Sequence, residues 1–491
     1  MTYVLALDAG TTSNRAIVFD SSGAPLSSAS VALPQHFPHD GWVEHHGGDI
    51  IDGLVDSARA AIAEAGIEPG QIAAVGLTNQ RETTLVWDRS TSEPVYPAIV
   101  WQDRRTAAYC ADLKAAGLEP EFAAKTGLLL DPYFSGTKIR WILDHIDDGQ
   151  GRAERGELAF GTVDTWVAWV LSGGQRHIMD ASNAARTLLF DIDRQCWDAS
   201  LMGHLNIPAA MLPSVLDSAG DLAPIQAEFF GAPLRLTGIA GDQHAALIGQ
   251  ACIEPGMVKS TYGTGCFMMV NTGQRRLPSQ HRLLSTLAYR LNGVCTYALE
   301  GAIFNVGTSI QWLRDGLAVL DDAAQSQAMA EQARDDEVFL VPAFTGLGAP
   351  WWDANARGLI CGLTRDTGRN EIVRAALDAC AYQTADLLQA MEADGQPCAA
   401  LRVDGGMVVN DWLCQRLADL CGVRIDRPEV TETTALGAAL LAAIGAGLYP
   451  DLAQATAQWS LQRSFQSTLD APTRGLRHRA WQGAVKRALS E

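Results

Sequence analysis

The feature that most constrains the fold is a short unit that occurs near the start of the chain and again just past its middle. Residues 3–20 combine an apolar strand, a Gly/Thr-rich turn at residues 8–13 and a second strand. Residues 257–272 repeat this design around a turn at residues 262–265. Both segments are typical of β-hairpins. Because the unit recurs in each half of a 491-residue chain, we predict two similar domains, at residues 1–249 and 250–491.

Strand-like and helical segments alternate between the hairpins, for example at residues 72–77 and 137–143. This alternation predicts an α/β fold. Residues 370–393 keep a helical spacing of apolar side chains, with Asn370 available as the cap and Gly395 as the terminator. Residues 433–450 carry no charge but are rich in Ala and Gly, which favours a closely packed buried helix over a membrane span.

Composition excludes several classes of partner. The chain has 37 Lys plus Arg against 56 Asp plus Glu, a net charge of -19, which repels polyanions and argues against nucleic acid and anionic membranes. We expect no integral membrane association. Ten cysteines without a C-x-x-C pair, and an N-terminus without a signal-peptide pattern, predict a reduced, cytoplasmic protein.

The first hairpin turn is a candidate phosphate site. Gly10, Thr11 and Thr12 offer backbone N–H groups and hydroxyls behind the carboxylate of Asp8, and Arg15 follows on the next strand. Such a turn can bind phosphate oxygens while the carboxylate holds a hydrated Mg²⁺. The ordinary alternative, a hairpin with a polar tip, is equally compatible with this motif alone.

Two further glycine turns strengthen the prediction. One is the second hairpin tip at residues 263–265, and the other is the Gly405-Gly406 pair between an apolar strand and a helix. Glycines there let a ligand lie against the backbone, and a helix N-terminus favours negative charge. The sequence has neither a P-loop nor a G-x-G-x-x-G motif after a strand. Three such turns spread over both halves predict a nucleotide site between them.

Residues 238–244 place one carboxylate, Asp242, among small residues and beside an amide. A short polar loop of this kind can display a general base to an aqueous cleft. A Gly-Asp pair alone is more often a turn. Together with the phosphate turns, it indicates phosphoryl transfer.

These strings, at residues 5–13, 241–243, 262–266 and 403–406, resemble the phosphate, catalytic and adenosine motifs of the FGGY family of carbohydrate kinases. Residues 78–83, 101–105, 131–138 and 346–352 resemble the members that phosphorylate glycerol. The resemblance implies an α/β fold of duplicated actin-like (ribonuclease H-like) ATPase domains flanking a central cleft. It also implies transfer of the γ-phosphoryl group of ATP to glycerol, giving sn-glycerol 3-phosphate, with glycerol and ATP as partners and Mg²⁺ as cofactor.

The resemblance implies a role for each matching residue, with Asp242 as the general base. The substrate-binding residues would be Arg81, Glu82, Trp101, Tyr133, Asp242, Gln243 and Phe267. Among them, Trp101 and Phe267 would form an apolar wall for the carbon edge of glycerol. The nucleotide-binding residues would be Thr11, Thr12, Ser13, Arg15, Thr264, Gly307, Gln311, Gly406 and Asn410. Asp8 and Asp242 would hold the metal. A homodimer or homotetramer is expected.

Some positions depart from the family pattern or have an ordinary structural explanation. Ala9, Met407 and Thr308 differ from the usual family residues, but none of these changes removes a phosphate ligand. Gln311 is also compatible with an exposed helical glutamine. Arg81 and Glu82 would point to opposite faces of a strand, but beyond a strand end both can turn into a cleft.

Two other functions compete with this interpretation. One is a kinase for another small polyol or sugar of the same family. The other is a non-catalytic actin-like module, which would not need the Arg81, Glu82 and Trp101 cluster. Control by histidine phosphorylation or by a sugar bisphosphate is not expected, because residues 205–243 contain no histidine and residues 226–233 lack a basic, glycine-rich loop.

Overall fold

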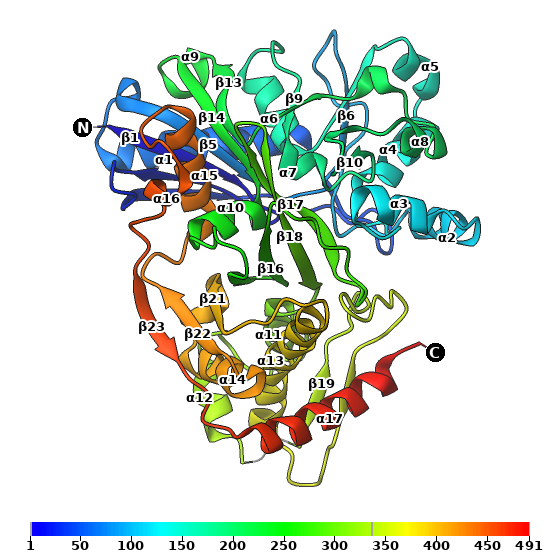
Figure 1. Cartoon of the computed structure of the whole chain (residues 1–491), viewed down its shortest axis with the longest axis vertical. Helices are drawn as coiled ribbons and strands as arrows, with labels where there is room; N and C mark the ends of the chain where they lie inside the picture. Colours follow the sequence, from blue (N-terminus) through cyan, green and yellow to red (C-terminus); the bar gives the residue numbers. More distant parts are fainter. Residues whose placement is uncertain (1, 335–336, 491) are drawn as a thin grey trace.

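Two mixed β-sheets organise the chain, one above the other in Figure 1. The computed structural model describes residues 2–334 and 337–490. The first sheet has the strand order β13-β14-β5-β1-β2-β3 and the second the order β17-β18-β16-β15-β21-β22-β23. The strands of the first sheet are β1 (Tyr3–Ala9), β2 (Ser13–Phe19), β3 (Pro25–Ala32), β5 (Ile72–Asn79), β13 (Ala219–Ile225) and β14 (Leu234–Gly241). Those of the second are β15 (Val258–Tyr262), β16 (Cys266–Gly273), β17 (Leu284–Leu291), β18 (Val294–Ile303), β21 (Ala400–Asp404), β22 (Arg424–Pro428) and β23 (Leu461–Phe465).

Both predicted hairpins are present, and the sheets around them share a topology. β1 pairs antiparallel with β2 and parallel with β5, whereas β15 pairs antiparallel with β16 and parallel with β21. β14 is also parallel to β5, and the register sets Ala9 and Gly241 on either side of Asn79. The ends of three strands therefore meet at one edge of the first sheet. The domain boundary at residues 249/250 stays a prediction.

Helices form layers outside and between the two sheets. Leu5 and Leu7 pack with α1 (Gly47–Ala65) and α6 (Val163–Leu171) on one face of the first sheet. Val4 and Ala6 point to the other face and pack with α15 (Thr433–Gly445). Met269 of the second sheet packs with α15 and α10 (Asp242–Gly249). The outer face of this sheet is covered by α13 (Arg369–Ala393) and α14 (Asp411–Cys421).

The charge-free segment predicted to be a buried helix is α15, which is largely buried. Although it comes from the second half of the chain, it lies among the elements of the first half (Figure 1). Close approach requires glycine, because a Cβ atom on Gly76 would collide with the Ala438 carbonyl oxygen and one on Gly238 with the Ala442 nitrogen. α15 also packs closely on α10, so a helix of the second half supports the helix that begins at Asp242.

The long helix α13 begins one residue earlier than expected. Gly368 rather than Asn370 is its cap, and the Glu371 carboxylate reaches back to accept from the Gly368 N–H at 2.9 Å, which is one half of a capping box. Asn370 therefore lies inside the first turn. A short 3₁₀ helix, Gly406–Val409, follows Gly405, and α14 begins after it with Asn410 as its cap, accepting from the Leu413 N–H at 2.9 Å.

Shorter elements complete the molecule. The remaining α-helices of the described residues are α2 (Ala107–Ala115), α3 (Glu119–Thr126), α4 (Ser135–His145), α5 (Gly149–Glu154), α7 (Ala181–Ala184), α8 (Ala199–His204), α9 (Ala227–Phe230), α11 (Gly307–Gln311), α12 (Gln325–Gln332), α16 (Leu452–Ala455) and α17 (Ala471–Ala488). Two-stranded sheets form from β4 (Glu44–His45) with β7 (Ala98–Ile99), β6 (Leu85–Asp88) with β8 (Leu158–Gly161), β9 (Ile178–Asp180) with β12 (Ser214–Leu216), β10 (Phe190–Asp191) with β11 (Cys196–Trp197), and β19 (Phe339–Val341) with β20 (Leu359–Cys361).

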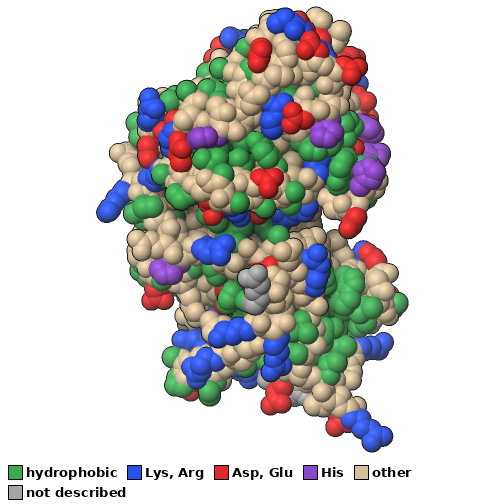
Figure 2. All heavy atoms as spheres, turned by 90° about the vertical axis from the view of Figure 1, so that its right-hand side faces the viewer, with side chains coloured by type: hydrophobic (Ala, Val, Ile, Leu, Met, Phe, Trp, Pro, Cys, Tyr) green, Lys and Arg blue, Asp and Glu red, His purple; other side chains and the backbone are tan. Residues whose placement is uncertain are grey.

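The surface carries charges of both signs. On the face shown in Figure 2, acidic and basic side chains are interspersed with neutral ones over both parts of the molecule. Among the helices of residues 2–334 and 337–490, none has the length and apolar character needed to cross a bilayer.

Candidate active site

The first hairpin turn holds a carboxylate beside backbone N–H groups. The Gly10 N–H donates to the Ser13 carbonyl at 3.1 Å and closes the turn. The pKa of Asp8, at the end of β1, is raised to about 7, mainly by burial; Arg15 lowers it and the charge of Asp242 raises it. A divalent cation would offset this unfavourable environment, and Mg²⁺ prefers carboxylate oxygens. The Asp8 carboxylate therefore suits a bound cation, and shared ligation of Mg²⁺ by Asp8 and Asp242 stays a prediction.

The remaining residues of this turn differ in their surroundings. Thr12 is exposed, whereas Thr11 is half-buried and its Oγ1 accepts a hydrogen bond from the Trp101 Nε1 at 2.9 Å. The Arg15 guanidinium forms an ion pair with Glu432, just before α15. The turn is thus tied to the predicted substrate wall on one side and to the second half of the chain on the other.

Asp242 is the first residue of α10, directly after β14, so it lies at a strand-to-helix junction rather than in a loop. Its Oδ1 accepts from the Gln243 backbone N–H at 2.7 Å and lies 3.1 Å from the Arg81 Nε. Its Oδ2 accepts from the Gln243 side-chain amide at 3.1 Å. The side chain of Asp242 is nevertheless 30% exposed. This carboxylate is fixed in orientation and still accessible, as a general base must be.

Arg81 and Glu82 both turn inward, although they are neighbours in sequence. They follow the end of β5, and Glu82 has a φ of 59°, in the left-handed region. This backbone conformation breaks the strand alternation that would separate the two side chains. Both are buried, and the Arg81 Nη2 donates to the Tyr133 hydroxyl at 3.3 Å. Both side chains therefore turn to the same side, and their contact with a substrate stays a prediction.

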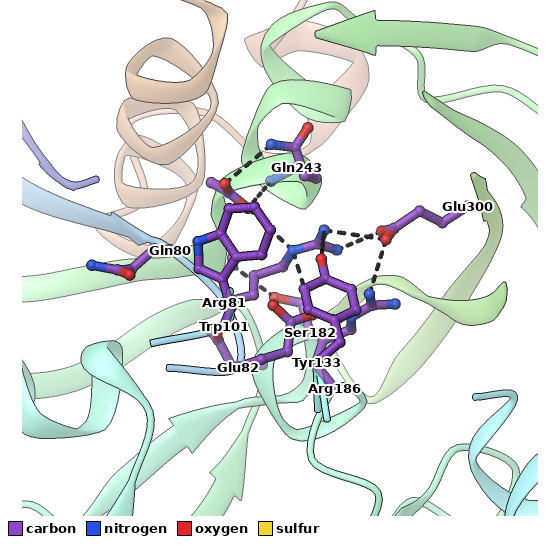
Figure 3. A network of polar contacts seen from close by, with 12 residues as sticks. Gln80, Arg81, Glu82, Trp101, Tyr133, Ser182, Arg186, Gln243 and Glu300 are labelled. Atoms are coloured by element: carbon purple, nitrogen blue, oxygen red, sulfur yellow. Dashed lines mark hydrogen bonds and ion pairs between the residues drawn. The ribbon is translucent and has the colours of Figure 1, made fainter. Parts of the chain in front are cut away.

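Aromatic rings from both halves lie beside these polar groups. The Trp101 ring centroid is 5.7 Å from that of Tyr133 and 5.9 Å from that of Phe267, both in edge-on arrangements. Phe267 belongs to β16 of the second sheet, and the Arg81 guanidinium lies 5.6 Å from its ring centroid. The predicted substrate residues therefore gather in one place, with Trp101 in front of the polar groups in Figure 3.

Sequence reasoning missed Arg186 and Glu300. The Arg186 Nε donates to Glu82 at 2.6 Å, and its Nη2 donates to Glu300 at 2.9 Å. Glu300 also accepts from both terminal nitrogens of Arg81 (Figure 3). Burial acts to raise the pKa of Glu300, but Arg186 and Arg81 outweigh it and hold this pKa at about 2.

A third missed residue is Lys259, which is buried on β15 and donates to the Gln243 side-chain oxygen at 2.6 Å. One signal could have found all three: each is a charged residue in an otherwise uncharged stretch, at residues 181–190, 255–274 and 291–313. Such residues are rarely buried without an opposite charge. The sequence does not say which opposite charges they meet.

A cavity of about 490 Å³ lies on the second half of the molecule. Its lining includes all the predicted nucleotide residues of this half, namely Thr264, Gly307, Gln311, Gly406 and Asn410. Ile310, Met407 and Val409 give it apolar walls. Its size and its mixture of apolar walls with a few polar groups are typical of a small-molecule site.

Local structure explains the shape of this cavity. The Gly307 N–H donates to the Gly263 carbonyl at 3.0 Å, and the Val306 N–H to the Thr264 carbonyl at 3.0 Å, so α11 begins against the second hairpin tip. Gln311 is an exposed residue at the end of this helix. It is therefore the exposed helical glutamine of the ordinary alternative and also lines the cavity, while its contact with a nucleotide stays a prediction.

Comparison with known proteins gives matches over the whole chain. Models of the N-terminal and C-terminal domains of the FGGY family of carbohydrate kinases match residues 3–249 and 258–446. Glycerol kinase 1 of Pseudomonas aeruginosa is 56% identical over 490 residues, covering 100% of this chain and 99% of that protein. The glycerol kinase of Ectopseudomonas mendocina is 55% identical over 491 residues, covering 100% and 99%.

A solved structure agrees with these matches. The crystal structure of Plasmodium falciparum glycerol kinase with ADP is similar, with a TM-score of 0.90 at 32% identity, covering 100% of this chain and 99% of that one. The predicted α/β fold with two actin-like ATPase domains is confirmed.

Proposed function

Since this chain belongs to the FGGY family of carbohydrate kinases, we propose that it transfers the γ-phosphoryl group of ATP to glycerol and forms sn-glycerol 3-phosphate, the first step of glycerol catabolism. The observation that carries the proposal is the set of Arg81, Glu82, Tyr133 and Asp242, gathered behind the Trp101 ring. A three-carbon triol offers only hydroxyls and one carbon edge. Charged hydrogen-bonding groups beside an apolar wall are the complementary surface.

Each side chain would perform one part of the reaction. Arg81, Glu82, Tyr133 and Gln243 bind the hydroxyls, while Trp101 and Phe267 contact the carbon edge. Asp242 accepts the proton of a terminal hydroxyl of glycerol. The oxygen of this hydroxyl attacks the γ-phosphorus in line with the oxygen that leaves as part of ADP. Arg81 and Gln243 hold the carboxylate in place during this transfer. Positioning of this kind lowers the entropic part of the barrier.

The nucleotide would span both halves of the molecule. Thr11, Thr12, Ser13 and Arg15 bind phosphate oxygens from the first hairpin, and Thr264 binds them from the second. Gly307, Gln311, Gly406 and Asn410 bind the adenosine part in the cavity next to the second hairpin tip. Mg²⁺ held by Asp8 and Asp242 would supply the charge that neutralises the phosphate oxygens. A phosphate contact requires Arg15 to exchange its ion pair with Glu432 for the nucleotide.

A panel of acceptors tests the proposal. ADP release from MgATP is measured with glycerol, erythritol, xylulose and ribulose, and glycerol should give the highest kcat/KM. Much faster phosphorylation of xylulose or ribulose would contradict glycerol as the substrate. It would support the alternative, a kinase for another small polyol or sugar of the same family. Cytoplasmic location and a homodimer or homotetramer stay predictions, the latter open to sedimentation.

A further inference from the structure

Four buried charges form a closed ring behind the candidate substrate site. Arg81 bonds to Glu300 through both terminal nitrogens, the closer pair at 2.5 Å, and Glu300 accepts from Arg186 at 2.9 Å. Arg186 donates to Glu82 at 2.6 Å, and Glu82 lies 3.9 Å from the Arg81 Nε. None of these side chains is more than 2% exposed. Positive and negative groups alternate, so the ring has no net charge.

Glu300 is the member that comes from the other half of the chain. It belongs to β18 of the second sheet, whereas Arg81 and Glu82 follow β5 of the first. Without Glu300, the two desolvated guanidinium groups would lose the carboxylate that lies between them and would repel each other, Arg186 keeping Glu82 and Arg81 keeping Asp242. Arg186 is further held over two rings, 5.6 Å from the Tyr133 centroid and 5.2 Å from that of Phe134.

The ring fixes Arg81 and Glu82, two of the charged side chains that would contact glycerol. Glu300 holds the terminal nitrogens of Arg81, which leaves the Arg81 Nε facing Asp242 at 3.1 Å. Arg186 holds one oxygen of Glu82, so this carboxylate does not collapse onto the neighbouring Arg81. Both side chains are thereby held ready for a ligand, and preorganisation of this kind lowers the cost of binding.

We propose that Glu300 and Arg186 are positioning residues for glycerol, acting through Arg81 and Glu82 without touching the substrate. This inference rests on the proposed function. It predicts that a change at Glu300 acts on glycerol and leaves the nucleotide largely unaffected, because the nucleotide cavity is lined by other residues. A merely structural role would instead lower stability and leave the glycerol KM unchanged.

The test compares Glu300→Gln with Asp378→Asn. Asp378 forms a similarly buried ion pair with Arg416, at 2.6 Å between α13 and α14, away from the candidate site, so its variant reports the cost of losing a buried charge alone. Glu300→Gln should raise the KM for glycerol about 10- to 100-fold while the KM for ATP stays within about 2-fold. Asp378→Asn should lower the melting temperature and leave both KM values near those of wild type.

Glu300→Asp keeps the charge but is shorter by one methylene, so its carboxylate cannot bridge both guanidinium groups in their present positions. Glu300→Asp should raise the glycerol KM less than Glu300→Gln does, and it replaces Glu300→Gln as the test if that variant does not fold. If a correctly folded variant of either kind has the glycerol KM of wild type, the inference is overturned. Wild-type protein that does not phosphorylate glycerol would instead contradict the proposed function, so the two failures are distinguishable.

Discussion

The Lys259 Nζ donates a hydrogen bond to the Gln243 Oε1 at 2.6 Å. A lysine ammonium group can only donate, so it fixes the carbonyl end of this amide toward itself. The amide nitrogen is then directed to the Asp242 Oδ2, 3.1 Å away. Lys259 belongs to the second sheet and Asp242 to the first half of the chain. The predicted general base is therefore oriented from across the molecule.

Replacing Lys259 with Met should release this amide. The Gln243 amide is then free to rotate, and an amide oxygen turned toward the Asp242 carboxylate would repel that carboxylate. We therefore expect kcat to fall about 10-fold, with little change in the KM for ATP. Thr261→Val is the matched control, because it removes the other oxygen that accepts from Lys259, at 3.0 Å, and keeps the Gln243 contact. Equal turnover in Lys259→Met and wild type would show that the amide needs no such anchor.

Asp242→Asn should fold normally and lose about 100- to 10,000-fold in turnover, the usual contribution of a positioned general base. Glycerol binding should fall much less, since the amide oxygen can still accept from the Gln243 N–H that now bonds to Oδ1. Steady-state kinetics give the turnover, and calorimetry with a non-hydrolysable ATP analogue gives the binding constant. Near wild-type turnover in the folded variant would remove Asp242 from the catalytic role.

Much of the architecture could be predicted because it is encoded locally. A Gly/Thr turn between two apolar strands is a short-range hairpin signal, so the sequence predicts both β1–β2 and β15–β16. The small, uncharged residues of α15 likewise indicated close helix packing. The start of α13 differs from the prediction, because the Glu371 carboxylate accepts from the Gly368 N–H and makes this glycine, rather than Asn370, the cap.

Contacts between residues far apart in the chain limit how much of the site the sequence can predict. The family motifs contain Arg81 and Glu82, but the groups that hold them, Arg186 and Glu300, are 104 and 219 residues away from their respective partners. Only the folded sheets bring them together. No local pattern states that a glutamate on β18 faces an arginine after β5, so the ring behind the site required the structure.

The start of α11 offers a test of the nucleotide site. A Cβ atom on Gly307 would lie 2.5 Å from the Gly263 carbonyl oxygen, part of the second hairpin tip, and 3.4 Å from the Met407 Sδ. Gly307→Ala should therefore displace the tip and raise the KM for ATP about 10-fold, with the glycerol KM unchanged. Gly483→Ala, in α17 with no atom near its added Cβ, should leave both constants unaltered. An unchanged ATP KM in Gly307→Ala would separate this glycine from the nucleotide.

His177 should make the protein sensitive to acid. Its pKa is lowered to about 4, mainly by burial. The neutral ring suits its contacts, because Nε2 lies 2.8 Å from the Phe160 carbonyl oxygen, to which it must donate, and Nδ1 lies 3.1 Å from the Arg89 Nη2, from which it must accept. Protonation would place a hydrogen between Nδ1 and a guanidinium group.

The direction of the pH effect follows from proton counting. In the unfolded chain the pKa of a histidine is about 6.5, so between this pH and about 4 the unfolded state binds more protons than the native one. The contribution of a neutral His177 to stability is fully present above pH 6.5 and is lost as the pH falls toward 4.

His177→Gln removes this titration together with the ring packing on Trp87, whose centroid is 5.5 Å away. In urea unfolding, the variant should thus be less stable than wild type at pH 7.5, and the gap should narrow as the pH is lowered to 5. His45, whose pKa is also lowered to about 4, mainly by burial, titrates in both proteins and cancels in the difference. A gap that stays constant over this range would mean that His177 does not change its proton affinity on folding.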